Sequence, residues 1–150
     1  MSGVIIPQIN DVRAWVKEIS GPTLLLFKFL PDINTKWYEA IDGALGLIQL
    51  SHYKENLHHK GAHLFYKIVK NHYFIDGNKR SAVIVIYLYY LVNGYIIRED
   101  PEAMLEIARK TAESDGTESE KEIGILEDRL NGITVSVITE TDLKEIREQV

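Results

Sequence analysis

The segment Asn71–Arg80, with the sequence NHYFIDGNKR, concentrates the side chains of this chain that could take part in chemistry. His72 comes first, a carboxylate follows at Asp76, and two cations stand together at Lys79 and Arg80. An imidazole with an ordinary pKa of about 6.5 can accept a proton near neutral pH. Carboxylate oxygens are ligands that Mg²⁺ prefers, and lysine and arginine bind phosphate oxygens. The segment therefore contains the residue types needed to activate a hydroxyl beside a metal-bound polyphosphate.

The backbone around Gly77 strengthens this interpretation. Asp76-Gly77 is a turn dipeptide, and glycine lets a ligand approach the main chain closely. The apolar pattern predicts a helix over 78–92 directly after the turn, so first-turn N–H groups and the positive end of the helix dipole face it. We expect the helix start and Arg80 to hold phosphate oxygens, Asp76 to hold Mg²⁺ and His72 to take the proton of an incoming hydroxyl. The alternative is a purely structural role for a polar turn, which composition alone favours.

Helical spacing of apolar residues predicts the elements that position the turn. The stretch 61–71 carries an apolar stripe on one face, and 78–92 is apolar almost throughout. Before the turn, further helices are expected over 10–19 with Asn10 as cap, over 23–30, and from Thr35 past Trp37, Ile41 and Leu45. After it, helices are expected from Pro101 with Asp100 as cap, from Ser119 to Asn131-Gly132, and from Asp142. Ser119 and Glu122 are expected to form a capping box at the start of the second of these. The stretch 47–60 has no clear period and is interpreted as a loop or small hairpin. Alternation over 133–137 predicts a short strand.

Composition limits the class of protein. The chain has 150 residues, 45% of them hydrophobic, which suits one globular domain. A net charge of −5 disfavours binding to an extended nucleic-acid backbone, and the absence of cysteine excludes a disulfide framework and fits a reducing cytosol. The apolar run over 82–92 is too short to span a bilayer, and the N-terminus has no signal-peptide pattern. We therefore expect a cytoplasmic protein without a membrane or nucleic-acid partner.

The order of residues in the turn resembles the signature of the Fic/Doc family, His-x-Phe-x-(Asp/Glu)-(Gly/Ala)-Asn-(Gly/Lys)-Arg, at every specified position. The neighbouring stretches 63–70 and 81–94 are similar to the helices that flank this signature, and the recognisable part covers about residues 40–130. The resemblance implies an all-α fold: a compact Fic/Doc-like helical bundle forming a single domain over 1–150. It also implies a small β-hairpin flap, for which 46–57 is the candidate.

The resemblance implies transfer of AMP or phosphate from ATP to a Ser, Thr or Tyr hydroxyl of a target protein. Carried over residue by residue, His72 is the general base, Phe74 is a buried anchor, Asp76 binds Mg²⁺, and the phosphates lie against Gly77, Asn78, Lys79 and Arg80.

Two positions bear on the subclass. AMP-transferring members usually have glycine where Lys79 stands and a second arginine where this chain has Val83. Lysine at the first position resembles the death-on-curing (Doc) branch, whose type member is a toxin that phosphorylates a translation factor. Gly77 departs from that type member, which has alanine there. We favour phosphate transfer, with AMP transfer as the alternative.

Other interpretations remain. A catalytically degenerate nucleotide-binding module is disfavoured by the intact His72 and Asp76, and a helical DNA-binding or antitoxin-like module by the acidic balance. The stretch 51–56, SHYKEN, fits the loose self-inhibitory pattern Ser/Thr-x-x-x-Glu-Gly/Asn, but we interpret this as chance. A separate antitoxin partner, as in a toxin-antitoxin pair, is then expected.

Overall fold

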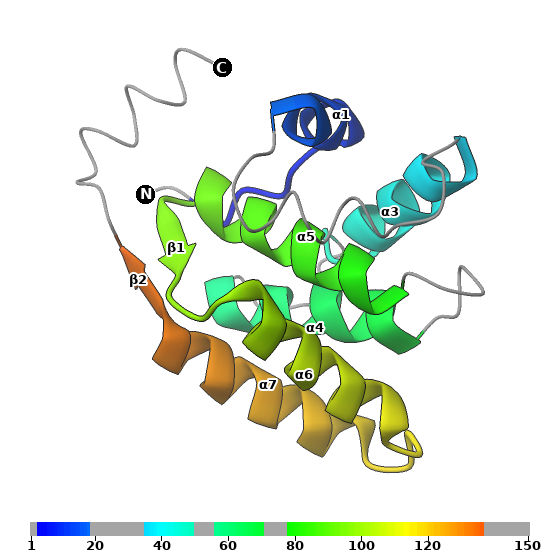
Figure 1. Ribbon diagram of the computed structural model, residues 1–150, viewed down its shortest axis with the longest axis vertical. Helices are drawn as coiled ribbons and strands as arrows, with labels where there is room; N and C mark the ends of the chain where they lie inside the picture. The colour runs from blue at the N-terminus through cyan, green and yellow to red at the C-terminus, as the bar shows by residue number, and fades with distance from the viewer. Residues whose placement is uncertain (1–2, 19–34, 50–55, 71–77, 137–150) are drawn as a thin grey trace.

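The computed structural model describes residues 3–18, 35–49, 56–70 and 78–136, which form six helices and one two-stranded sheet (Figure 1). The elements are α1 (Ile9–Glu18), α3 (Thr35–Leu47), α4 (Leu57–Lys70), α5 (Asn78–Val92), β1 (Tyr95–Ile97), α6 (Pro101–Glu113), α7 (Ser119–Ile133) and β2 (Thr134–Ser136). The expected all-α class, with a small amount of strand, is confirmed. Within these residues no helix has the length and apolar character needed to cross a membrane.

Helix α5 lies at the centre of the described structure. From Ser81 to Tyr90 every residue except Tyr87 is buried, as expected for a helix that is apolar on all sides. Helix α4 packs along α5 and is covered on its other side by α7, while α6 packs against α5 (Figure 1). Helices α1 and α3 lie on the opposite side of α5. The two helices that flank the NHYFIDGNKR turn therefore form the core of the bundle.

Helix α3 confirms the stripe predicted from Thr35. Trp37, Ile41 and Leu45 are all buried, because residues four apart in a helix share one face. The helix continues through Gly46 to Leu47, so the expected hairpin does not begin at Gly46. Residues 50–55 of that hairpin lie outside the described part of the chain.

Helix α4 begins earlier than predicted. The interpretation of 47–60 as loop or hairpin is wrong for Leu57–Lys60, which form the first turn of α4. Asn56 caps this turn, since its Oδ1 accepts a hydrogen bond from the backbone N–H of His59 at 2.9 Å. The first turn shows no apolar period because two of its residues are histidines. His58 contacts Tyr90 of α5, and His59 contacts Glu127 of α7.

Of the N-terminal caps predicted for α1, α6 and α7, one is confirmed and two are wrong. Asp100 caps α6 as predicted, its Oδ1 accepting from the Ala103 N–H at 2.8 Å. The capping box of Ser119 with Glu122 is wrong: the N-cap residue of α7 is Glu118, without a side-chain cap bond, and Glu122 accepts instead from the Tyr66 hydroxyl. Helix α1 begins at Ile9, so Asn10 is not its cap.

Of the C-terminal ends predicted for α5 and α7, the first is confirmed and the second is wrong. Gly94 adopts a φ of 82° just after α5, which confirms Asn93-Gly94 as the end of that helix. Helix α7 passes through Asn131-Gly132 and ends at Ile133, so that predicted end is wrong. The helices expected over 23–30 and from Asp142 lie outside the described residues.

The two strands close one end of the bundle. β2, over Thr134–Ser136, confirms the short strand expected near the C-terminal end and pairs antiparallel with β1, with Ile96 opposite Val135. Strand β1 is not predicted by the sequence, because three residues are too few to show alternation. The sheet joins the residues after α5 to the end of α7.

Candidate functional site

The NHYFIDGNKR segment joins the end of α4 to the start of α5. Its residues 71–77, which include His72, Phe74, Asp76 and Gly77, lie outside the described part of the chain. Asn78, Lys79 and Arg80 form the first turn of α5. The structure therefore defines the end of α4 and the start of α5, which this segment connects.

The start of α5 is fixed from the side of α3. The indole Nε1–H of Trp37 donates to the Oγ of Ser81 at 2.9 Å, and both residues are buried. A buried hydrogen bond of this kind is costly to leave unmade, so it holds the first turn of α5 in one position relative to α3. Ser81 directly follows Arg80, and the bond therefore positions the predicted phosphate-binding residues.

The end of α4 is fixed from the side of α6. Lys70, the last residue of α4, donates from Nζ to the backbone carbonyl of Ser114 and, at 3.4 Å, to that of Ala112. These carbonyls lie at the C-terminal end of α6, where the helix dipole favours a cation. Lys70 is two residues before His72, so this contact fixes the helix end that precedes the predicted base in the sequence.

The loop after α6 adds a carboxylate to this contact. Asp115 is exposed and accepts hydrogen bonds at Oδ1 from the backbone N–H and the hydroxyl of Thr117, at 2.9 and 2.7 Å. These hydrogen bonds, and to a lesser degree the charge of Lys70, lower the pKa of the Asp115 carboxyl. Asp115 is therefore charged at neutral pH.

The first turn of α5 presents positive charge. The side chain of Lys79 is exposed, whereas Arg80 is half-buried and its Nε atom is fully buried. First-turn N–H groups of a helix have no partner within it, and together with the dipole they favour an anion. Val83 is completely buried in the core, so its side chain cannot reach a ligand at the turn.

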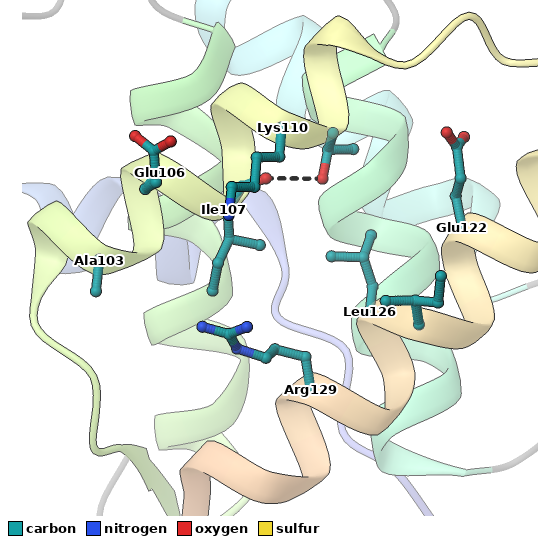
Figure 2. A pocket seen from close by; sticks show the side chains of 9 residues that line it. Ala103, Glu106, Ile107, Lys110, Glu122, Leu126 and Arg129 are labelled. Atoms are coloured by element: carbon teal, nitrogen blue, oxygen red, sulfur yellow. Dashed lines mark hydrogen bonds between the residues drawn. The ribbon is translucent and has the colours of Figure 1, made fainter.

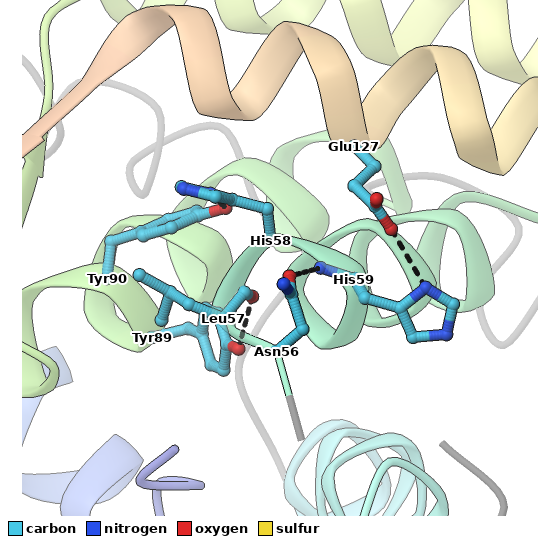
Figure 3. A network of polar contacts seen from close by, with 7 residues as sticks. All are labelled: Asn56, Leu57, His58, His59, Tyr89, Tyr90 and Glu127. Atoms are coloured by element: carbon cyan, nitrogen blue, oxygen red, sulfur yellow. Dashed lines mark hydrogen bonds and ion pairs between the residues drawn. The ribbon is translucent and has the colours of Figure 1, made fainter. Parts of the chain in front are cut away.

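At its other end α4 is held by a network of polar contacts (Figure 3). The Tyr89 hydroxyl donates to the Leu57 carbonyl at 2.6 Å, and the Tyr90 hydroxyl lies 3.0 Å from His58 Nδ1. His59 Nδ1 lies 2.8 Å from the Glu127 carboxylate of α7. The network joins α4 to α5 and α7 at the end of α4 opposite to the one that the NHYFIDGNKR segment follows.

Burial explains the protonation of this network. Desolvation lowers the pKa of His58, and the nearby Glu127 carboxylate opposes this effect only in part. Burial likewise raises the pKa of Tyr90 well above its ordinary range. Both side chains are therefore neutral at pH 7, which suits a hydrogen bond within the fold.

No metal site is formed by the residues that the structure describes: none of their histidine and carboxylate side chains is grouped in threes with a geometry that could hold an ion. The predicted ligand Asp76 lies outside them. The sequence does not identify Trp37, Ser81 or Lys70 as positioning residues, because the two residues of each contact are 44 positions apart and no spacing rule connects them.

Comparison with models of protein families matches residues 27–90 to the Fic/DOC family. This range contains α3, α4, the NHYFIDGNKR segment and α5 up to Tyr90, and it confirms the resemblance drawn from the signature. No curated protein and no solved structure gives a significant match to the chain.

Proposed function

We propose that this chain, similar to the Fic/DOC family over residues 27–90, transfers a phosphate-containing group from ATP to a Ser, Thr or Tyr hydroxyl of a target protein. One observation carries the proposal. The family signature leads directly into the first turn of a buried helix whose start is held by the Trp37–Ser81 hydrogen bond. A rigid helix start with Lys79 and Arg80 provides a fixed anion site.

Each residue of the turn has a role in this reaction. The N–H groups at the start of α5 and the guanidinium of Arg80 bind phosphate oxygens. His72 takes the proton as the hydroxyl oxygen of the target forms a bond to phosphorus and the remainder of the nucleotide leaves. Asp76 holds Mg²⁺ through its carboxylate, and the ion neutralises charge on the phosphates when it is bound. The resemblance implies that Phe74 is a buried anchor, and Gly77 lets the phosphates approach the backbone.

Two residues favour phosphate transfer over AMP transfer. Lys79 places an exposed ammonium in the first turn of α5, where AMP-transferring members usually have glycine. Val83 lies in the core, at the position where AMP-transferring members usually carry a second arginine. A lysine beside the phosphates changes which phosphorus faces the hydroxyl, and the γ-phosphorus is then the one attacked. This Doc-like chemistry fits a toxin restrained by a separate antitoxin.

The test uses ATP labelled at either the α or the γ phosphate. The protein and its His72→Ala variant are incubated with Mg²⁺ and cell lysates from two different sources, and protein-bound label is measured after electrophoresis. Label from the γ position supports phosphate transfer, and label from the α position supports AMP transfer. Loss of either signal in His72→Ala assigns the base.

Binding and folding are measured beside transfer. Calorimetry with Mg-ATP shows whether the nucleotide binds, and circular dichroism shows whether His72→Ala remains folded. Binding without label from either position, in both lysates, would support the degenerate nucleotide-binding alternative. Equal labelling by the protein and a folded His72→Ala variant would overturn the assignment of the base.

A further inference from the structure

A groove runs between α6 and α7, on a part of the chain outside the region matched to the family (Figure 2). Its volume is about 410 Å³. Ile107 of α6 and Leu126 of α7 line it, and Ile125 beside them is 61% exposed. Ile107, Ile125 and Leu126 lie together and form the aliphatic floor of the groove, so a contiguous apolar surface is available there for another molecule.

The lining residues repeat at helical spacing. Ala103, Ile107 and Lys110 of α6 lie on one face of that helix, and Leu126 and Arg129 lie on the facing side of α7. The stretch from Ala103 to Lys110 is about 10 Å long at the helical rise of about 1.5 Å per residue. A groove of this length between two helices fits about two turns of a third helix laid between α6 and α7.

The acidic and basic side chains around the groove differ in whether they already have partners within the fold. Glu106 is paired with Arg109 at 3.2 Å, and Glu122 accepts from the Tyr66 hydroxyl at 3.0 Å. Lys110 and Arg129 have no charged or hydrogen-bonding partner among the residues that the structure describes, and they approach the groove from opposite helices (Figure 2). In a chain of net charge −5, the groove thus offers two available cations beside an apolar floor.

We propose that the α6–α7 groove docks an amphipathic helix of a partner protein, with aliphatic side chains on its inner face and carboxylates on its flanks. The aliphatic side chains cover Ile107, Ile125 and Leu126, and the carboxylates pair with Lys110 and Arg129. A nucleic acid does not fit this surface, because its affinity comes mainly from contacts with phosphates and the floor of the groove is aliphatic. The surface is independent of the proposed transfer reaction.

The experiment uses the full chain and a synthetic helical peptide of three to four turns, cross-linked between side chains. Leucines lie on one face at positions i, i+3 and i+7, and glutamates flank them. Two matched peptides replace the glutamates by lysines or the leucines by serines. Binding is followed by fluorescence anisotropy, and shifts of backbone amide signals locate the site.

The acidic peptide is expected to bind about ten-fold or more tightly than either matched peptide, with amide shifts confined to α6 and α7. Arg129→Glu and Ile125→Asp each weaken this binding about ten-fold or more, because one removes the charge pair and the other the apolar contact. Lys36→Glu, an exposed charge change on α3, leaves it unchanged. Circular dichroism confirms that each variant is folded.

Three results overturn the proposal. The first is no binding of the acidic peptide, and the second is equal binding of all three peptides. The third is a concentration-dependent dimer, seen by sedimentation and abolished by Ile125→Asp, since a second copy of the chain would then occupy the groove.

Discussion

The indole of Trp37 and the hydroxyl of Ser81 are buried together and joined by a hydrogen bond of 2.9 Å, although 44 residues separate them in the chain. This bond connects α3 to the first turn of α5, one residue beyond Arg80. The contact of Lys70 with the C-terminal end of α6 does the same for the last turn of α4. The two helix ends that the NHYFIDGNKR segment connects are thus fixed by different neighbours.

Substitution of Ser81 tests the first of these contacts. Ser81→Ala leaves the buried Trp37 N–H without this acceptor, so the free energy of unfolding is expected to fall by about 1–3 kcal/mol. Urea unfolding measures the change. A double-mutant cycle with Trp37→Phe isolates the pair, and strictly additive effects would show that the hydrogen bond does not couple the two residues.

Substitution of Lys70 tests the second contact. Lys70→Met keeps an apolar side chain of similar length but removes the ammonium that donates to the α6 carbonyls. The free energy of unfolding is expected to fall by about 1.5–3 kcal/mol, the usual range for a hydrogen bond to a charged group. If the proposed transfer reaction holds, kcat falls more than the KM for ATP rises, since Lys70 precedes His72.

Lys121→Met is the matched control for Lys70→Met, because Lys121 is exposed on α7 and pairs only at 3.7 Å with Glu118. Its unfolding free energy and kcat are expected to stay close to those of the unmodified chain. Equal effects of the two substitutions would contradict the role given to Lys70.

Gly61 is required by the packing of α4 on α5. A Cβ atom there would lie 2.9 Å from the Tyr90 Oη and 3.0 Å from the Tyr89 Cε2, and both tyrosines are completely buried. Gly61→Ala is therefore expected to lower the free energy of unfolding by about 1–3 kcal/mol, even though alanine favours helix. At Gly124 of α7 an added Cβ atom would meet no packed neighbour within 4 Å. Gly124→Ala should therefore raise the free energy of unfolding by about 0.5–1 kcal/mol. Thermal unfolding of both variants checks the opposite signs.

The sequence predicts those parts of the fold that local pattern determines. The bounds of α5 are correct because an apolar stretch of this length can only be a buried helix, and the Asp100 cap of α6 is correct because its bond is local. The first turn of α4 is missed because His59 finds its partner, Glu127, 68 residues later. The capping box of α7 fails for the same reason, since Tyr66 binds the Glu122 carboxylate.

In the candidate site, too, local sequence order can be predicted and long-range contacts cannot. The order of His72, Asp76 and Arg80 can be read directly, and its family resemblance is confirmed over residues 27–90. The residues that hold the two helix ends cannot be read, because tertiary packing alone brings Trp37 to Ser81 and Lys70 to the end of α6. The signature thus leads to the proposed chemistry, whereas the residues that hold the helix ends are found only from the structure.

Substitution of Lys79 tests the proposed choice of phosphorus. Lys79→Gly removes an exposed ammonium and restores the residue usual in AMP-transferring members, so α-label on the target is expected to increase relative to γ-label. The ratio of the two labels is measured with the same lysates as above. Lys110→Gly is unsuitable as a control because it lies in the α6–α7 groove, so Lys121→Gly serves instead. An unchanged label ratio in Lys79→Gly would show that this lysine does not select the phosphorus.

The buried His58 predicts a specific pH dependence of stability. Desolvation lowers its pKa below the ordinary value of 6.5. Between the lowered value and 6.5 the unfolded chain binds the proton and the folded chain does not, so the contribution of His58 is full above pH 6.5 and is lost as the pH falls. His58→Gln cannot titrate and retains the other groups near this position, including Glu127, Tyr90 and Tyr95. We expect the unfolding free energy of the unmodified chain, minus that of His58→Gln, to decrease between about pH 7.5 and about pH 5.5. Urea unfolding of both proteins at each pH measures this difference, and a constant or increasing difference would show that the folded chain does not disfavour the charged imidazole.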